Sequence, residues 1–229
     1  MLFYFVRHGQ TDHNVRGIIQ GQMDTPLNDH GRREAALVAH ALRDVPFTEA
    51  WTSSLSRAAE TAQIIMQYHD NVPLYSHPLL IERGLGSMEG RRRLKGEKAP
   101  KDAESSQVFS KRVTRWLDGF LASHMPASGP LQGDKDATVL VLSHGAYLGQ
   151  LLSLLLSPVY GFKLDPGVDL KKSCLNTSIM RVSIEIKDGQ PEGVVLSWGE
   201  VGHLKELLGE ELEIADVVDD EGKGRGRRG

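Results

Sequence analysis

Residues 2–14 read LFYFVRHGQTDHN, and residues 2–6 are a continuous apolar run rich in aromatic side chains. A short apolar run that ends at a glycine is typical of a central strand in a parallel sheet covered on both faces. Arg7 and His8 fall at the carboxyl end of this predicted strand, and Gly9 lets the backbone turn away there. Ligands bind at that edge of open α/β sheets. A cation beside an imidazole at this edge indicates an anion held next to a nucleophile or base.

The rest of the chain alternates between strand and helix patterns, which predicts an α/β fold. Strands are expected at 48–53 and 138–142, and an antiparallel hairpin at 177–186 and 194–198 with its turn at 188–189. Helices are expected at 31–44, from 57 to about 69, from 106 onward, at 146–156 and at 203–212. The expected architecture is a three-layer α/β/α sandwich with a mostly parallel central sheet, an antiparallel edge hairpin and a small cap insertion.

A second apolar run, residues 138–142, ends in a histidine and a glycine as the first one does. If the two predicted strands are neighbours, His8 and His144 converge on one spot. Arg57 begins a helix after a strand and therefore belongs to the same edge, and Glu82 lies in an irregular segment that should overhang it.

This set of side chains suits phosphoryl transfer. Guanidinium groups match phosphate oxygens in bidentate geometry, and a neutral imidazole nitrogen can attack phosphorus. A carboxylic acid such as Glu82 can protonate the departing alkoxide. The arginines and second histidine can neutralise the charge that a metal ion would otherwise neutralise, so no metal and no other cofactor is expected.

Four groups of residues resemble the motifs of the histidine phosphatase superfamily, also called the phosphoglycerate mutase-like family. They are Arg7-His8-Gly9 with Thr11, Asn14 and Gln20-Gly21; Ser53-Ser54-Leu55 with Arg57-Ala58 and Thr61-Ala62; Leu80 and Glu82 with Gly86 and Glu89-Gly90; and Ser143-His144-Gly145. The four occur in the family's order and cover residues 2–150, with a weaker likeness as far as residue 205. Four ordered motifs are a specific signal, whereas the first one alone would be weak.

The resemblance implies a phosphohistidine mechanism in which His8 takes the phosphoryl group. Arg7, Arg57 and His144 would clamp its oxygens, while Glu82 would first protonate the leaving oxygen and then deprotonate the attacking water. Further binding contacts would come from Thr11, Asn14, Gln20, Gly21 and Gly145. The implied function is hydrolysis of small phosphorylated metabolites such as sugar phosphates, and the chain looks most like the broad-specificity and fructose-2,6-bisphosphatase-like branch.

Two alternatives stay open. A phosphoglycerate-type mutase uses the same residues but shields the phosphoryl group from water; the roughly fifteen residues between Gly90 and Ser106 look shorter than a mutase cap and favour a water-accessible phosphatase. A non-catalytic phosphate-binding module would be indicated by loss of a motif residue, and none is lost.

The run Arg91-Arg92-Arg93 reads as a solvated face. The functional hypothesis is that it binds a second phosphate or a carboxylate of the substrate.

Composition sets further bounds. The formal charge of −3 predicts no general attraction to nucleic acid, and with one cysteine there is no internal disulfide and no CxxC metal motif. No apolar run reaches the ~18 residues of a membrane span, and the simplest expectation is a cytoplasmic, or additionally nuclear, protein.

One phosphatase domain is expected over 1–215, with its cap at about 84–106 and a disordered tail at 216–229. The sequence leaves the oligomeric state open.

Overall fold

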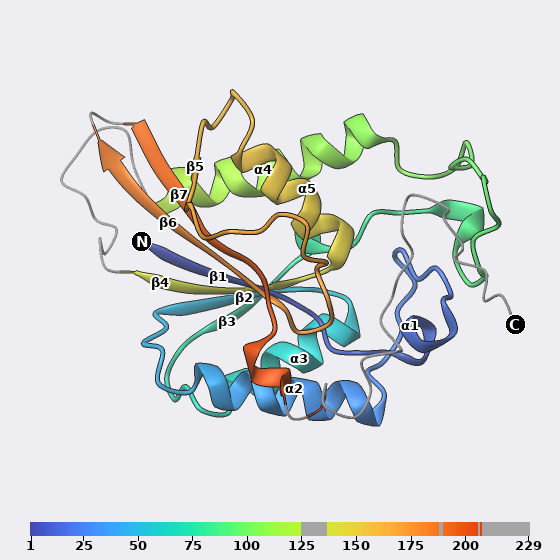
Figure 1. Ribbon diagram of the computed structural model, residues 1–229, viewed down its shortest axis with the longest axis horizontal. Coiled ribbons are helices and arrows are strands. Elements are labelled where there is room, and N and C mark those ends of the chain that lie inside the picture. The colour runs from blue at the N-terminus through green and yellow to red at the C-terminus, as the bar shows by residue number, and fades with distance from the viewer. Residues whose placement is uncertain (125–136, 188–189, 206, 208–229) are drawn as a thin grey trace, which may run out of the picture.

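The computed structural model describes residues 1–124, 137–187, 190–205 and 207. Within these ranges seven strands form one sheet in the order β3-β2-β4-β1-β6-β7-β5 (Figure 1). Their bounds are Leu2–Arg7 (β1), Glu49–Ser53 (β2), Leu74–His77 (β3), Thr138–Ser143 (β4), Lys163–Leu164 (β5), Ile179–Lys187 (β6) and Gln190–Glu200 (β7). Strands β1 to β4 pair in parallel, and β6 runs antiparallel to both β1 and β7. The mostly parallel sheet with an antiparallel hairpin is thereby confirmed.

Strand β1 lies in the interior of the sheet, as its apolar sequence predicts. Phe3 and Phe5 pack into the core on one face, and Val6 packs into the core on the other. The register of β1 with β4 places Arg7 opposite Ser143, so the chain leaves both strands side by side at the same edge.

Two pairs of helices complete the three layers. Helices α2 (Asp29–Leu42) and α3 (Ser56–Met66) cover one face of the sheet, and α4 (Ser106–His124) and α5 (Gly145–Leu155) cover the other (Figure 1). A five-residue helix, α1 (Asp12–Arg16), lies beyond the carboxyl end of β1. Short 3₁₀ turns occur at Pro78–Leu80 (η1), Gly86–Met88 (η2) and Gly202–Leu204 (η3).

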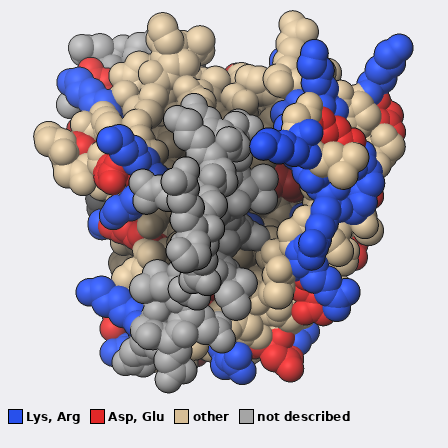
Figure 2. Space-filling view, turned by 45° about the vertical axis from the view of Figure 1, so that its right-hand side comes forward, with Lys and Arg blue, Asp and Glu red and all other residues tan. Residues whose placement is uncertain are grey.

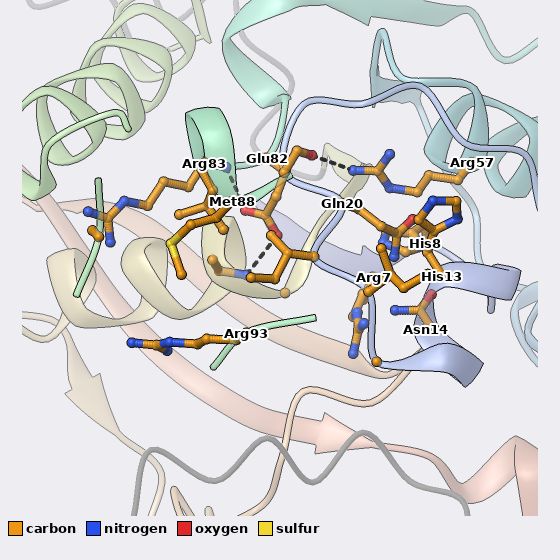
Figure 3. Close-up of a pocket in the computed structure, with 18 residues that line it drawn as sticks. Arg7, His8, His13, Asn14, Gln20, Arg57, Glu82, Arg83, Met88 and Arg93 are labelled. Atoms are coloured by element: carbon orange, nitrogen blue, oxygen red, sulfur yellow. Dashed lines mark hydrogen bonds between the residues drawn. The ribbon is translucent and has the colours of Figure 1, made fainter. Parts of the chain in front are cut away.

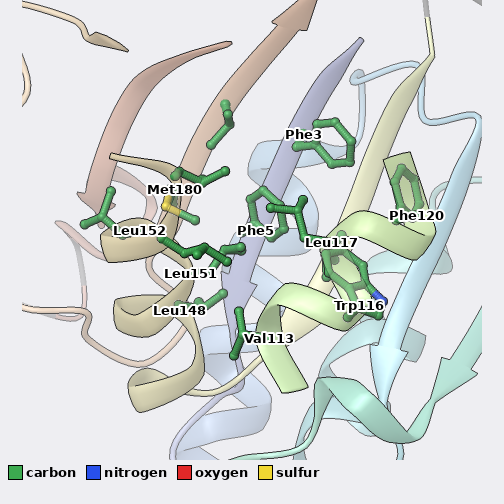
Figure 4. Packing of buried hydrophobic residues seen from close by; sticks show 14 of the residues in the cluster. Phe3, Phe5, Val113, Trp116, Leu117, Phe120, Leu148, Leu151, Leu152 and Met180 are labelled. Atoms are coloured by element: carbon green, nitrogen blue, oxygen red, sulfur yellow. The ribbon is translucent and has the colours of Figure 1, made fainter. Parts of the chain in front are cut away.

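The larger hydrophobic core lies between the sheet and helices α4 and α5 (Figure 4). Helix α4 buries the stripe that its sequence spacing predicts, namely Phe109, Val113, Trp116, Leu117, Phe120 and Leu121. Burying a side chain of this size stabilises the fold by roughly 1.5–3 kcal/mol. Helix α4 is therefore firmly fixed on the sheet.

Several details differ from the sequence-based expectation. The sequence does not predict strand β3, because residues 74–77 show no alternation of apolar and polar side chains. In the structure only the two end residues of β3 are half-buried. Helix α3 ends at Met66 rather than near residue 69. The hairpin is one strand in from the edge, because β5 pairs with the outer side of β7. The expected final helix begins instead with the 3₁₀ turn η3.

Three expectations fall wholly outside the described residues: the linker at 125–135, the hairpin turn at 188–189 and the tail at 216–229. The expected helix at 203–212 falls outside them at residue 206 and at residues 208–212. Within the described residues, none of the helices combines the length and the apolar character that crossing a bilayer requires.

Candidate active site

The parallel pairing of β1 and β4 brings the two predicted histidines together. The ring centroids of His8 and His144 lie 5.1 Å apart, and both side chains are buried. The backbone N–H of His8 donates to the carbonyl oxygen of Ser143 at 3.0 Å, which continues the strand pairing past the end of β1. The predicted convergence of the imidazoles is confirmed.

The local contacts of His8 leave one ring nitrogen free to react. Its Nδ1 lies 2.7 Å from the carbonyl oxygen of Gly9. A carbonyl only accepts, so Nδ1 carries the hydrogen and Nε2 keeps its lone pair in the neutral ring. Burial, followed by the charges of Arg57 and Arg7, holds the pKa of His8 well below its usual range. The imidazole is therefore neutral and nucleophilic at neutral pH.

His144 makes its side-chain contact through the other ring nitrogen. Its Nε2 lies 2.8 Å from the hydroxyl of Ser53 on β2. The Ser53 oxygen also accepts from the backbone N–H of Leu55 at 3.2 Å, and its own hydrogen can donate to Nε2. When Ser53 donates, the imidazole proton lies on Nδ1, a buried atom with no hydrogen-bond partner in the described chain. Burial and then Arg57 keep the pKa of His144 well below its usual range, so the neutral ring offers one N–H.

Arg57 is fully buried at the start of α3 and organises the loop that faces His8. Its Nη1 donates to the carbonyl of Met23 at 2.7 Å and its Nη2 to that of Gly21 at 2.9 Å. Its Nε finds no acceptor among the described residues. Burial lowers the pKa of Arg57 to about 10, which leaves the guanidinium charged at neutral pH. Arg7 is fixed from the other side, because its Nη1 donates to the carbonyl of Cys174 at 2.7 Å.

Glu82 lies where the sequence predicts, over the strand ends, and its position is fixed by backbone groups. Its Oε2 accepts from the N–H of Ala146 at 3.0 Å and its Oε1 from that of Arg83 at 2.7 Å (Figure 3). Its Oε1 also accepts from the N–H of Tyr147 at 3.1 Å. Two of these donors belong to the first turn of α5, where N–H groups point at an anion without intrahelical partners.

Arg7, His8, Arg57 and Glu82 line a cavity of about 530 Å³, whereas His144 is fully buried and is not among the lining residues. The predicted binding residues Asn14, Gln20, Gly21 and Gly145 line it as well. Thr11 instead lies beneath the cavity with no exposed surface. Its hydroxyl lies 2.9 Å from the side-chain oxygens of both Asn14 and Gln20. Thr11 therefore contacts two residues that line the cavity and does not line it itself.

The comparisons with known proteins agree with this geometry. The sequence profile of the histidine phosphatase superfamily (branch 1) matches residues 3–196. The chain belongs to this superfamily.

Relatives of this histidine phosphatase cover nearly its full length. A probable phosphatase of Schizosaccharomyces pombe is 31% identical over 212 residues, which span 90% of this chain and 96% of the relative. A probable phosphoglycerate mutase GpmB of Yersinia enterocolitica is 32% identical over 228 residues, spanning 92% and 98% of the two chains. Among solved structures, Bacillus stearothermophilus YhfR superposes with a TM-score of 0.68 at 25% identity, covering 89% of this chain and 99% of its own.

A mycobacterial glucosyl-3-phosphoglycerate phosphatase, solved with vanadate, superposes with the same TM-score of 0.68 at 25% identity, covering 87% of this chain and 99% of its own. The superfamily membership and the phosphatase relatives identify the chain as an enzyme, a phosphatase of the histidine phosphatase class.

The histidine phosphatase cavity also contains residues that the sequence did not single out, among them His13, Arg83, Leu85 and Met88. Of the arginine run 91–93, Arg93 lines the cavity. Arg91 instead pairs with Glu97 on the segment's own surface, and Arg92 donates to the carbonyl of Arg16. On the face that carries this segment, Lys and Arg side chains gather along one side (Figure 2). Three consecutive arginines give no sequence signal for which of them faces inward.

The described residues contain no group of three or more His, Cys, Asp or Glu side chains arranged to hold a metal ion.

Proposed function

We propose that this phosphatase hydrolyses phosphate monoesters of small metabolites through a phosphohistidine formed on Nε2 of His8. The observation that carries the proposal is the 2.7 Å contact between Nδ1 of His8 and the carbonyl of Gly9. It fixes the tautomer whose free lone pair lies on Nε2, in a ring that burial and two arginines keep neutral.

In the first step, Nε2 of His8 attacks phosphorus, a P–N bond forms and the ester P–O bond breaks. The leaving oxygen takes a proton from the carboxylic acid of Glu82, so the alcohol departs neutral. Arg7, Arg57 and the Nδ1–H of His144 donate to the three other phosphoryl oxygens. These donors are fixed before substrate arrives, so little reorganisation is needed as charge spreads over the transferring group.

In the second step, the carboxylate of Glu82 takes a proton from water, whose oxygen attacks phosphorus. The P–N bond breaks, its electron pair returns to Nε2 of His8, and inorganic phosphate leaves. Glu82 is then protonated and His8 is neutral, as before the first step.

We further infer that the preferred metabolite carries a second anionic group. Arg83 and Arg93 line the cavity on the side away from Arg7, His8 and Arg57, as their labelled side chains show (Figure 3). A phosphate bound at His8 would therefore leave a second phosphate or carboxylate near these two cations. The matched test pair is Arg93→Ala and Arg92→Ala, because Arg92 is its neighbour but turns to the backbone of Arg16. The proposal expects only Arg93→Ala to raise KM, and only for substrates with two anionic groups.

The reaction itself is tested with an aryl phosphate and with sugar phosphates in the presence of EDTA, comparing wild type with His8→Ala. Activity that survives EDTA, is lost in His8→Ala by several orders of magnitude and is retained in His124→Asn would support the proposal. His124 is a suitable control because it pairs with Glu49, away from the cavity residues. A trapped phosphoenzyme that is labile to acid and absent from His8→Ala would identify the intermediate directly.

The phosphoglycerate mutase alternative is separated by the products. The name of the Yersinia relative makes this comparison necessary. Release of inorganic phosphate from a phosphoglycerate supports the phosphatase, whereas interconversion of its isomers without release of phosphate would replace the proposed reaction by a mutase.

A further inference from the structure

We propose that Arg112 and Glu104 are positioning residues that hold the backbone of residues 79–84 so that the Glu82 carboxyl group meets the leaving oxygen. The inference rests on the proposed acid role of Glu82. Arg112 projects from helix α4, which the hydrophobic core fixes on the sheet, and it reaches the active-site edge with its side chain only 12% exposed.

Every N–H of the Arg112 guanidinium has an acceptor within reach. Its Nη1 donates to the carbonyl oxygens of Leu79 at 3.0 Å and Ile81 at 2.7 Å. Its Nη2 donates to the carbonyl of Glu82 at 3.0 Å and to Oε2 of Glu104 at 2.7 Å, and its Nε donates to Oε1 of Glu104 at 2.9 Å. These five bonds use the five N–H groups that a guanidinium has, in the rigid planar fork that lysine lacks.

Glu104 holds the same segment from its other end. Its Oε2 accepts from the backbone N–H of Gly84 at 3.1 Å, and its own N–H donates to the carbonyl of Gly84 at 2.8 Å. Its carbonyl accepts from Nε of Arg83 at 3.0 Å. The residues on both sides of Glu82 are therefore fixed by one ion pair.

This arrangement bears on catalysis because Arg112 shares the Glu82 carbonyl with Gln22, while the Glu82 carboxylate accepts from the N–H of the adjacent Arg83 and from helix α5. The carboxylate oxygens accept from Ala146 and Tyr147 at the start of α5. The ion pair fixes where the side chain begins and α5 fixes where it ends. A general acid must lie within hydrogen-bond reach of the leaving oxygen, and supporting contacts set such geometry to about 0.5 Å. Losing the ion pair should therefore impair proton transfer more than phosphate binding.

The dependence of kcat on the leaving group distinguishes a positioning role of Arg112 from a merely structural one. An alkyl phosphate needs the acid because its alkoxide is a poor leaving group, whereas a nitrophenyl phosphate departs without one. We expect Arg112→Lys to lower kcat on an alkyl phosphate by about tenfold more than on a nitrophenyl phosphate, within the range that a general acid contributes. KM for both substrates should change little, because Arg7, Arg57 and His8 bind the phosphate.

The decisive experiment is a double-mutant cycle of Arg112→Lys with Glu82→Gln on the two substrates. If Arg112 acts through Glu82, Arg112→Lys adds no further loss to Glu82→Gln on the alkyl phosphate. Glu104→Gln is the second variant, which keeps the test available if Arg112→Lys does not fold. Arg181→Lys is the matched control, because Arg181 makes a two-bond pair with Glu200 on strands β6 and β7.

An equal loss on both substrates, or additivity with Glu82→Gln, would overturn the positioning role while leaving the acid role of Glu82 intact. If Glu82→Gln by itself shows no dependence on the leaving group, the proposed acid is wrong, and the positioning role is overturned with it.

Discussion

His8 and His144 lie next to each other across the β1–β4 pair with their ring centroids 5.1 Å apart, and each ring makes its hydrogen bond through a different nitrogen. His8 donates from Nδ1 to its neighbour's carbonyl and keeps a lone pair on Nε2, while Nε2 of His144 lies against the Ser53 hydroxyl, which as a donor leaves the ring hydrogen on Nδ1. In the proposed mechanism these two contacts, one with the backbone and one with a side chain, make a nucleophile and a donor from the same residue type.

Neither imidazole should titrate in the range where free histidine does. Burial and the arginines lower the pKa of both His8 and His144 well below 6.5, because a protonated ring would be desolvated beside Arg57. NMR titration of the ring carbons from pH 8 to pH 5.5 should show both residues neutral throughout. His124, whose pKa the carboxylate of Glu49 raises, should protonate above its usual range in the same experiment. Protonation of His8 near pH 6.5 would contradict the proposed neutral nucleophile.

The same shifts predict how stability depends on pH. Below about pH 6.5 the unfolded chain binds protons on His8 and His144 that the native protein does not bind, so the free energy of unfolding should fall as the pH falls. His203 adds to this trend, since burial lowers its pKa to about 4. His124 opposes it, because its native pKa is raised. Each unmatched proton contributes about 1.4 kcal/mol per pH unit.

Denaturant unfolding between pH 7.5 and pH 5.5 measures this slope in a window where carboxylates stay largely ionised. The His124→Asn variant should show the steeper decline toward low pH, because it lacks the opposing group. A stability that rises as the pH falls would mean that the active-site histidines are charged in the native state.

Ser53→Ala should impair catalysis without weakening binding to the same extent. Without the hydroxyl, Nε2 of His144 loses its donor, and the ring is no longer held in the tautomer that presents Nδ1–H. A neutral hydrogen bond contributes about 0.5–1.5 kcal/mol, so kcat on an aryl phosphate should fall about tenfold. The ring-nitrogen chemical shifts of His144 should show a mixed tautomer.

The control is Thr48→Val, which removes a hydroxyl that donates to the carbonyl of Thr138 near the opposite end of β2. It should cost comparable stability and leave kcat unchanged. If Ser53→Ala keeps both the wild-type rate and the wild-type tautomer, then Ser53 does not set the proton position.

The parts of the site that could be predicted from sequence are those that follow from chain direction. Two apolar runs with the same ending predict adjacent parallel strands, and adjacent parallel strands must deliver His8 and His144 to one edge. The apolar stripe of α4 is equally local, because a helix repeats every 3.6 residues.

The remaining parts depend on contacts between distant segments. Ser53 meets His144 across 91 positions, and Arg112 meets Leu79 across 33, and neither contact has a periodic signature. Thr11 belongs to a motif and was expected to bind substrate, yet its place beneath the cavity follows from the short helix α1 that it caps. Strand β3 forms because β2 offers an open edge, while its own sequence shows no alternation.

Gly31→Ala should destabilise the protein and disturb the active-site edge together. A Cβ at Gly31 would lie 2.1 Å from the carbonyl oxygen of Gln10, in the loop that follows His8, so α2 and this loop would have to separate. Overpacking of this kind costs about 1–3 kcal/mol, which corresponds to a Tm lower by roughly 2–4 °C per kcal/mol in a chain of this size. Because the loop continues directly from β1, kcat should fall as well.

Gly119→Ala is the matched control. A Cβ at Gly119, on helix α4, would meet nothing within 4 Å, so this variant should stabilise the helix by about 0.5–1 kcal/mol and leave activity unchanged. Thermal unfolding and aryl phosphate hydrolysis on both variants check the prediction, and a Gly31→Ala protein as stable and active as wild type would mean that the approach of α2 to the loop is not required.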